Sequence, residues 1–339
     1  MESANLPLRA TAVRLALFNH KGGVGKTTLT MNVARAMAKL GKRVLVVDSD
    51  PQCNLTSLLV EDEVVNDLLD TSDAPEGQTI WSALKPIVEA TGDVRYIPPI
   101  ELPHGMFLLP GDIRLAEFEQ ELGTMWGECF QRRTRGFRGT TALSTVVNQV
   151  VWKYGIDYVF YDSGPNIGAL NRTILLDCDF FAIPAACDLF SVRAIKTLGH
   201  TLANWIRDWD TIAELAPKDI YLLPGQPHLL GYIPQRYKMY GGKPSMQFAP
   251  FIPLIEKTVR SDVIAVLTRV NPLLVAEAVS PLRLGGVKDF GSLATASQRE
   301  GVAISEVSTG TQEQRDIAED TFEDLAKRII DRTSGAVMR

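Results

Sequence analysis

Short apolar runs alternate with stretches of helical periodicity along this chain. The first run, Val13–Phe18, is followed by a glycine-rich loop, by apolar residues at helical spacing over Leu29–Leu40, and by a second run, Arg43–Asp48. A strand, a loop, a helix and a strand within about 35 residues form a βαβ unit, whose two strands are parallel. Similar patterns predict further strands at Ile156–Asp162, Phe180–Ala185 and Leu229–Ile233, and helices at Thr141–Tyr154, Ser191–Trp205 and Ala318–Asp331.

The predicted fold class is α/β, with a mostly parallel β-sheet covered by helices on both faces. No internal repeat or flexible linker divides the sequence, so we expect residues 1–339 to form a single domain. Two stretches depart from the pattern. Glu61–Asp73 holds six acidic residues and no basic ones, which predicts a solvated loop or helix face. Pro224–Pro253 is rich in glycine, proline and aromatic residues, which predicts irregular structure.

The composition narrows the class of protein. The chain has 339 residues, of which 45% are hydrophobic and 22% are charged. These fractions are typical of a folded globular protein and exclude a disordered, collagen-like or small disulfide-rich chain. The four cysteines are widely spaced without a C-x-x-C pair, which favours a reducing compartment. The sequence shows no signal-peptide pattern and no apolar run of the ~18 residues that a membrane span needs. We therefore expect a soluble, cytoplasmic protein.

The glycine-rich loop at Lys21–Thr28 has the residue types that bind a nucleoside triphosphate. Glycines let consecutive N–H groups point inward around a phosphate, and the helix that follows directs its positive end at the same anion. Lys26 is placed to reach the β- and γ-phosphates, the Thr27 hydroxyl to ligate Mg²⁺, and Thr28 to reach the α-phosphate. The alternative interpretation is a glycine-rich turn with surface lysines. It fits poorly, because a predicted strand precedes the loop and a predicted helix follows it. The predicted nucleotide-binding residues are Gly22, Gly23, Val24, Gly25, Lys26, Thr27 and Thr28.

The start of this loop departs from the general P-loop pattern. That pattern has a glycine five positions before Gly25, where this chain has His20, and a second lysine, Lys21, follows. Simple phosphate binding does not need a second cation beside Lys26. The additional lysine makes sense if it stabilises charge on a nucleotide held by a neighbouring subunit, as an arginine finger does in trans.

The loop sequence KGGVGKTT at 21–28 resembles the deviant Walker A motif of the ParA/MinD family of dimeric P-loop ATPases. Two further motifs support the resemblance. Residues 48–54, DSDPQCN, look like the family's D-x-D-P-Q-G-N, with Cys53 where glycine is usual. Residues 162–168, DSGPNIG, are similar to the family's D-x-P-P-S-L-G, with Gly164 at the first proline. The resemblance is loose from about Gln226 to Asp289, so we predict a family-atypical insertion over 226–289.

The resemblance implies a P-loop NTPase fold and a molecular switch that binds ATP and Mg²⁺ and hydrolyses ATP slowly. Two subunits would enclose two ATP molecules in a homodimer, with Lys21 crossing the interface, and a protein partner would stimulate hydrolysis. The implied catalytic residues are Lys21, Lys26 and Asp50, of which Asp50 orients or activates the attacking water. Thr27 and Asp162 would hold Mg²⁺, Asp162 through water. For Asp48, a structural hydrogen-bonding role and a catalytic role stay open.

The resemblance leaves open what such a switch acts on. In the first hypothesis, the ATP-bound dimer binds DNA nonspecifically at the nucleoid and segregates or positions a cargo, as ParA-type partition ATPases do. In the second, the chain is a regulatory or assembly subunit of a mobile-element or defence system, and it contacts a protein partner through 226–289. A third hypothesis, an iron–sulfur carrier, fits poorly because the cysteines are isolated.

Two basic clusters bear on the choice between DNA and protein. Gln131–Arg138 contains four arginines, and Gln235–Lys243 interleaves cations with aromatic residues, a composition suited to phosphates and bases. An ion-paired surface remains an alternative for the first cluster, and a protein interface or local packing for the second. The net charge of −5 gives no bulk attraction to nucleic acid. The last helix has mixed charges, so we expect it to pack on the core rather than to anchor the chain to a membrane.

Overall fold

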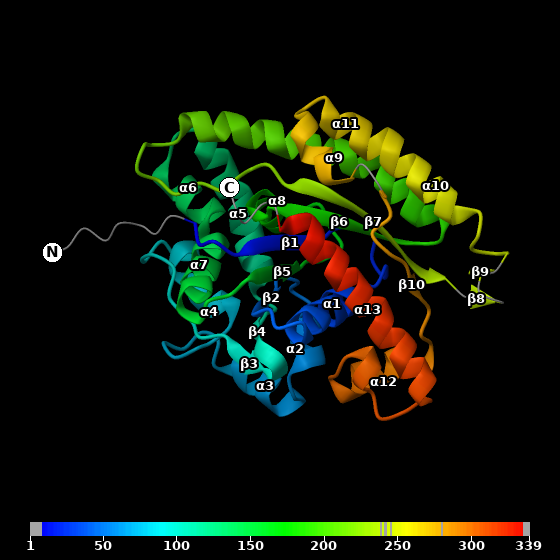
Figure 1. Ribbon diagram of the computed structural model, residues 1–339. Coiled ribbons are helices and arrows are strands. Elements are labelled where there is room, and N and C mark those ends of the chain that lie inside the picture. The colour runs from blue at the N-terminus through cyan, green and yellow to red at the C-terminus, as the bar shows by residue number, and fades with distance from the viewer. Residues whose placement is uncertain (1–8, 238, 241–242, 245, 279–280, 335–339) are drawn as a thin grey trace.

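The computed structural model contains one large, mostly parallel β-sheet between two layers of helices (Figure 1). It describes residues 9–237, 239–240, 243–244, 246–278 and 281–334. The strand order of the main sheet is β10-β7-β6-β1-β5-β2-β4-β3, and a separate hairpin pairs β8 with β9. The strands are β1 (Val13–Leu17), β2 (Val44–Asp48), β3 (Ile100–Leu102), β4 (Met106–Leu109), β5 (Tyr158–Asp162), β6 (Phe180–Ala186), β7 (His228–Tyr237), β8 (Met239–Tyr240), β9 (Lys243–Pro244) and β10 (Val287–Lys288).

One face of the sheet is covered by helices from the two ends of the chain. Their apolar side chains pack together with those of β1, β2, β5 and β6 that point to this face. The last helix also lies along the first one, as Figure 1 shows in red and blue. These elements are α1 (Lys26–Lys39), α2 (Asn54–Leu59), α12 (Ser292–Glu300), η4 (Ile304–Glu306) and α13 (Gln312–Thr333). The core packing expected of the last helix is confirmed, because Phe322, Leu325 and Ile329 are buried against the sheet.

The opposite face is covered by the middle of the chain. Its apolar side chains form the larger of the two hydrophobic clusters. The helices that contribute to it are α4 (Ile80–Val88), α5 (Leu115–Phe130), α6 (Thr134–Thr140), α7 (Ala142–Tyr154), α8 (Ala169–Asp177), α9 (Leu189–Leu215), α10 (Phe251–Thr258), the π-helical η2 (Val259–Ile264), α11 (Ala265–Thr268) and η3 (Pro272–Ala278). Two short elements, α3 (Asp62–Asp70) and η1 (Pro103–Gly105), complete the described chain.

The parallel arrangement brings four loops to one edge of the sheet. Strand β1 lies between β5 and β6, and β5 also pairs with β2, all in the same direction. Every residue of β1, β2, β5 and β6 is buried, as expected for parallel strands that are covered on both faces. The loops after these strands therefore meet at their carboxyl ends, which is where open α/β sheets bind ligands. Strand β3, at one end of the sheet, is antiparallel.

The predicted α/β architecture is confirmed, and the predicted strands and helices lie within a few residues of the observed ones at most ends. The acidic stretch agrees with the predicted solvated helix face, because α3 has Val65 and Leu68 buried and its carboxylates exposed. Two stretches differ. Helix α9 continues ten residues past the expected end at Trp205, to Leu215. Pro224–Pro253 is not irregular throughout, because it contains the ten-residue strand β7.

The range 226–289 contains two strands of the main sheet and the helices between them. Strand β7 pairs with β6 over seven residue pairs, and β10 extends the sheet beyond β7. Between these strands, α10, η2 and α11 pack against α9, where Gly199 lies directly on the Asp262 backbone. An insertion over 226–289 stays a prediction.

All four cysteines are buried free thiols, at Cys53, Cys129, Cys178 and Cys187. Within the described residues, no helix is both long enough and apolar enough to cross a bilayer.

Candidate functional site

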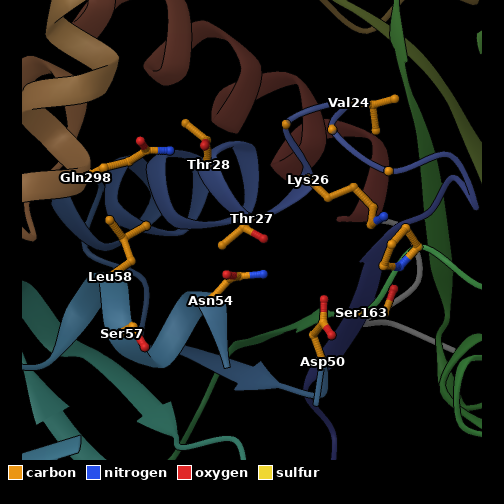
Figure 2. Close-up of a pocket in the computed structure, with 14 residues that line it drawn as sticks. Val24, Lys26, Thr27, Thr28, Asp50, Asn54, Ser57, Leu58, Ser163 and Gln298 are labelled. Atoms are coloured by element: carbon orange, nitrogen blue, oxygen red, sulfur yellow. The ribbon is translucent and has the colours of Figure 1, made fainter. Parts of the chain in front are cut away.

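A cavity of about 510 Å³ opens at the carboxyl ends of β1, β2 and β5 (Figure 2). The predicted phosphate loop forms one wall, and the loops after β2 and β5 face it. The cavity is lined by Gly22, Gly23, Val24, Gly25, Lys26, Thr27, Thr28, Asp50, Asn54, Ser57, Leu58, Ser163, Pro165 and Gln298. All seven residues predicted to bind the nucleotide are therefore in one place, together with Asp50.

The backbone of the phosphate loop has the conformation that its glycines allow. Gly23 and Gly25 have φ values of 70° and 81°, in the left-handed region that disfavours side chains. Gly25 precedes α1, and no side chain caps the helix, so its first N–H groups remain available to an anion in the cavity. A Cβ at Gly25 would also lie 2.7 Å from Gln235 Oε1 at the end of β7. Space and backbone geometry both require glycine there.

Lys26 is buried beneath the loop. Its Nζ donates a hydrogen bond to the Asn19 carbonyl oxygen at 3.0 Å, which holds the side chain along the phosphate wall. Burial lowers the pKa of Lys26, while the charges of Asp162 and Asp50 oppose the change. An anionic phosphate would compensate this partly desolvated cation, as P-loop chemistry requires.

Asp162, the last residue of β5, is a buried carboxylate without a counter-charge in contact. Its two carboxylate oxygens are shielded from solvent and have no hydrogen-bond partner among the described residues. Burial and the neighbouring Asp48 raise the pKa of Asp162 to about 8, although the Thr27 hydroxyl and Lys26 oppose the rise. Buried polar atoms of this kind normally have a partner. The donor set fits Mg²⁺: Thr27 would be a ligand, and Asp162 would act through coordinated water.

Two further carboxylates follow β2 and differ in their surroundings. Asp50 lines the cavity, and its Oδ1 accepts the Gln52 amide at 3.0 Å. Asp48 does not line the cavity, and its Oδ2 accepts both the amide and the hydroxyl of Thr56, at 2.7 and 2.6 Å. Burial raises the pKa of Asp48 to about 6. The geometry thus gives Asp48 a structural role in fixing the start of α2, and Asp50 is the carboxylate that faces a bound ligand.

Lys21 does not line the cavity that its own loop forms. Its Nζ lies 2.5 Å from Asp188 Oδ2 and 3.2 Å from Ser191 Oγ, at the start of α9. Asp188 also caps that helix through its other oxygen, which accepts the Ser191 amide at 2.8 Å. The two lysines of the loop are thus separated, with Lys26 under the phosphates and Lys21 at the rim.

The departure from the usual D-x-D-P-Q-G-N motif places a residue other than glycine in a strained backbone conformation. Cys53 stands where glycine is usual and has φ 53°, a conformation that glycine adopts without strain. The Cys53 side chain is buried, and Cys53 is the N-cap residue of α2. A residue other than glycine thus adopts the left-handed backbone conformation at this position of the motif.

The arginine cluster is largely ion-paired. Arg135 contacts Glu121 and Glu128 at 2.9 and 3.2 Å, and Arg138 contacts Asp93 at 2.7 Å. Arg133 lies 3.7 Å from Glu128. These contacts favour the ion-paired alternative for Gln131–Arg138.

The second basic cluster is only partly described. Arg236 donates to the Gly23 carbonyl at 2.7 Å, so this cation lies on the phosphate loop itself. Lys238, Gly241 and Gly242 lie outside the described residues.

Sequence reasoning missed several residues near the site. Asn54 is the last residue of the second motif, and its position there could have predicted it. Ser57 and Leu58 of α2 and Gln298 of α12 also line the cavity, and no motif marks them. Glu119 of α5 reaches the loop after β5 from a helix that the periodicity did not single out.

Comparisons with known proteins agree with this geometry. A family model described as an AAA domain matches residues 13–213, more than half of the chain. The sporulation initiation inhibitor protein Soj of Bacillus subtilis is 31% identical over 194 residues, which is 56% of this chain and 64% of Soj. The aligned part of the chain thus spans less than two thirds of that relative's length.

Solved structures share the fold over nearly the whole chain. Protein DIP2308 from Corynebacterium diphtheriae has a TM-score of 0.67 at 24% identity, over 96% of this chain and 99% of its own. The structure of pNOB8 ParA bound to nonspecific DNA has a TM-score of 0.60 at 17% identity, over 96% and 99%. The family model, the relative and the motifs at 21–28, 48–54 and 162–168 together show that the chain belongs to the ParA/MinD family of P-loop ATPases.

Proposed function

We propose that this protein is a dimeric ATP switch of ParA type. ATP and Mg²⁺ occupy the cavity, two subunits close around two nucleotides, and the closed dimer binds DNA nonspecifically to segregate or position a cargo. Hydrolysis is slow, a protein partner stimulates it, and the product ADP releases the dimer. The protein acts in the cytoplasm, at the nucleoid.

The observation that carries this proposal is the separation of the two lysines. Lys26 serves the phosphates of its own cavity, whereas Lys21 lies at the rim with a single half-exposed carboxylate partner, Asp188. A cation at the rim of a phosphate site is placed to reach across an interface and stabilise the charge of a neighbour's transferring phosphoryl group. Asp50 supplies the carboxylate that orients the attacking water.

Two observations support DNA as the ligand of the closed dimer. A protein with the same fold, pNOB8 ParA, is described as bound to nonspecific DNA. In this chain, Arg193 and Lys196 are exposed on α9 and form no ion pair within the described residues. Residues 189–207 of that helix contain no acidic side chain. Cations without nearby counter-charges are suited to phosphate backbones.

The decisive experiment uses the Asp50→Ala variant, which should load ATP and hydrolyse it poorly. We expect it to form a dimer with ATP but not with ADP, measured by light scattering. The ATP form should bind unrelated duplexes with an affinity that falls steeply with salt, because counterions are released from the phosphate backbone. Absence of DNA binding in both nucleotide states, with an intact ATP dimer, would reject the DNA part of the proposal.

The second candidate is a regulatory or assembly ATPase that acts on a protein partner without DNA. It is favoured by the helical layer of α10, η2 and α11, which lies outside α9 and leaves Leu254 exposed, and by Met246, which is exposed in the segment before α10. Exposed apolar residues can contribute to a protein contact. An ATP dimer that does not bind DNA would make this candidate the working hypothesis.

A further inference from the structure

The loop that follows Asp162 is tied together by its own asparagines. Asn171 Nδ2 donates to the carbonyl oxygens of Gly164 and Asn166, at 2.9 Å in both cases. Asn166 Oδ1 accepts the Gly168 amide at 2.8 Å. These bonds hold residues 164–168 together at the start of α8.

This loop forms part of the wall around the reacting phosphate. Ser163 and Pro165 line the cavity. A Cβ at Gly164 would lie 3.3 Å from Asp50 Oδ1, so the loop backbone is in contact with the carboxylate that faces the attacking water. A displacement of the loop therefore changes the position of Asp50 and the width of the cavity.

The end of the loop at Gly168 lies against Glu119 of α5. A Cβ at Gly168 would lie only 1.8 Å from Glu119 Oε1, so an added methyl group would displace this carboxylate from the loop. Glu119 Oε1 is shielded from solvent and has no hydrogen-bond partner in the described part of the chain. A carboxylate in such a position is not held there by a surface ion pair; it fills space against the loop backbone and faces the N–H end of α8.

Asp50 and Glu119 thus lie against two glycines of the same loop, Gly164 and Gly168. Burial raises the pKa of Glu119, and the negative charge of Asp50 raises it further, against the Leu170 amide and the Asn166 side chain. This effect of the Asp50 charge on Glu119 is expected from the contacts, because both carboxylates lie next to the same segment of six residues.

We propose that Glu119 is a positioning residue for ATP hydrolysis, which sets the place of loop 163–168 by contact at Gly168 and thereby the place of Asp50. The inference rests on the proposed function, because it assigns a role within the same reaction. Glu119 does not touch the phosphates or the water, so its loss should slow hydrolysis and leave nucleotide binding in place.

The test is a double-mutant cycle between Glu119 and Gly168, with kcat for ATP hydrolysis and the dissociation constant of ATP measured separately. We expect Glu119→Ala to lower kcat by about tenfold and to change ATP affinity by less than about threefold. Gly168→Ala should also lower kcat, because the new methyl group collides with the carboxylate. The double variant should be no slower than Glu119→Ala, because the collision partner is gone, and such losses are not additive.

Two variants separate this role from a general effect on folding. Glu119→Gln keeps the shape and an acceptor oxygen, so it should retain kcat within about threefold of the wild type. Glu117→Ala is the matched control on the same helix, since Glu117 is exposed and pairs only with Arg114, and it should leave kcat unchanged. If Glu119→Ala fails to fold, Gly168→Ala and Glu119→Gln still decide the question.

The possible failures can be told apart. A wild-type protein that binds ATP but never hydrolyses it would reject the proposed function, and the role of Glu119 with it. Hydrolysis by the wild type with an unchanged kcat in Glu119→Ala would overturn this inference alone. Additive losses in the double variant would likewise overturn it.

Discussion

Lys21 Nζ lies 2.5 Å from Asp188 Oδ2, and both residues sit at the rim of the phosphate cavity rather than inside it. This ion pair joins the first residue of the phosphate loop to the N-cap of α9. The pair is partly exposed, so its worth in isolation is about 0.2–1 kcal/mol. A stronger electrostatic partner, such as the nucleotide of a second subunit, can therefore replace Asp188.

The first prediction concerns Lys21. Lys21→Ala should lower the hydrolysis rate by at least about tenfold, equivalent to about 1.4 kcal/mol, and change ATP affinity by less than about threefold. The reason is that Lys21 does not line its own cavity. Lys26→Ala, which removes the buried cation under the phosphates, is the control that should abolish ATP binding. Equal loss of binding in both variants, measured by titration with labelled ATP, would contradict the separation of roles.

The second prediction concerns Asp188. Asp188→Asn keeps a good helix N-cap but removes the charge that holds Lys21. Lys21 is then free, so the ATP-dependent dimer should form up to about fivefold more tightly, as the loss of a weak ion pair in the monomer allows. Sedimentation across a concentration series measures this constant. A weaker dimer would show that Asp188 itself contributes to the interface.

The third prediction concerns Asp162. Its buried carboxylate has no hydrogen-bond partner among the described residues, so Asp162→Asn should stabilise the metal-free protein, by about 1–3 kcal/mol. The same change should abolish Mg²⁺-dependent hydrolysis. Denaturant unfolding in EDTA and an ATPase assay with Mg²⁺ measure the two effects. A variant that loses stability in EDTA would mean that the carboxylate has a partner in solution.

The fourth prediction concerns a buried ion pair far from the cavity. Arg14 is fully buried on β1 and donates to both carboxylate oxygens of Asp177. Asp177→Asn leaves the guanidinium without a counter-charge, which should cost about 3–5 kcal/mol of unfolding free energy.

The pH dependence of that variant follows from the direction of the pKa shift. Burial would raise the pKa of Asp177, but the charges of Arg14 and Arg9 hold it below its ordinary value. The stabilisation is therefore present above about pH 4 and is lost as the pH falls below it. In urea unfolding experiments at pH 3–6, the unfolding free energy of Asp177→Asn should therefore depend less on pH than that of the wild type. An unchanged pH dependence would mean that other carboxylates cause the loss of stability in acid.

The fifth prediction separates the two basic surfaces. The double variant Arg193→Ala, Lys196→Ala should weaken DNA binding by the ATP form and reduce the salt slope by about two. The matched variant Arg135→Ala, Arg138→Ala removes arginines that are already ion-paired, so it should leave the slope almost unchanged. Filter binding across a salt series distinguishes them. If instead the Arg135→Ala, Arg138→Ala variant lost DNA binding and the other variant did not, the DNA contact would be assigned to Gln131–Arg138.

The phosphate loop was predictable because its chemistry is local. Glycines, a lysine and a hydroxyl within eight residues, between a strand and a helix, leave few alternatives. The roles of Asp50 and Asp162 were implied by the family resemblance, since each stands in a motif at the carboxyl end of a buried strand. Glu119 was not predictable from the pattern, because its partner Gly168 is 49 residues away and the contact exists only once α5 has packed on the start of α8.

Strand β7 shows why composition misled at Pro224–Pro253. Pro234 lies within a core strand, where proline is normally excluded for lack of an N–H group. Here β10 pairs with β7 only from Gln235 onward, so the ladder on that side does not extend to Pro234. The end of α9 was missed for a different reason. Its apolar positions continue to Trp209 and Ile212, and these residues pack on elements that the periodicity alone did not locate.

The length of α9 gives the Lys21–Asp188 contact a mechanical meaning. The helix has 27 residues, so it is a rod of about 40 Å whose tip at Asp188 meets the phosphate loop. The layer of α10, η2 and α11 packs along the side of this helix. A tilt of only about 5° at the tip would sweep the far end through about 3–4 Å, given a rise of 1.5 Å per residue. Helix α9 thus connects the phosphate loop, which contacts it at Asp188, with the layer of α10, η2 and α11 that packs along it.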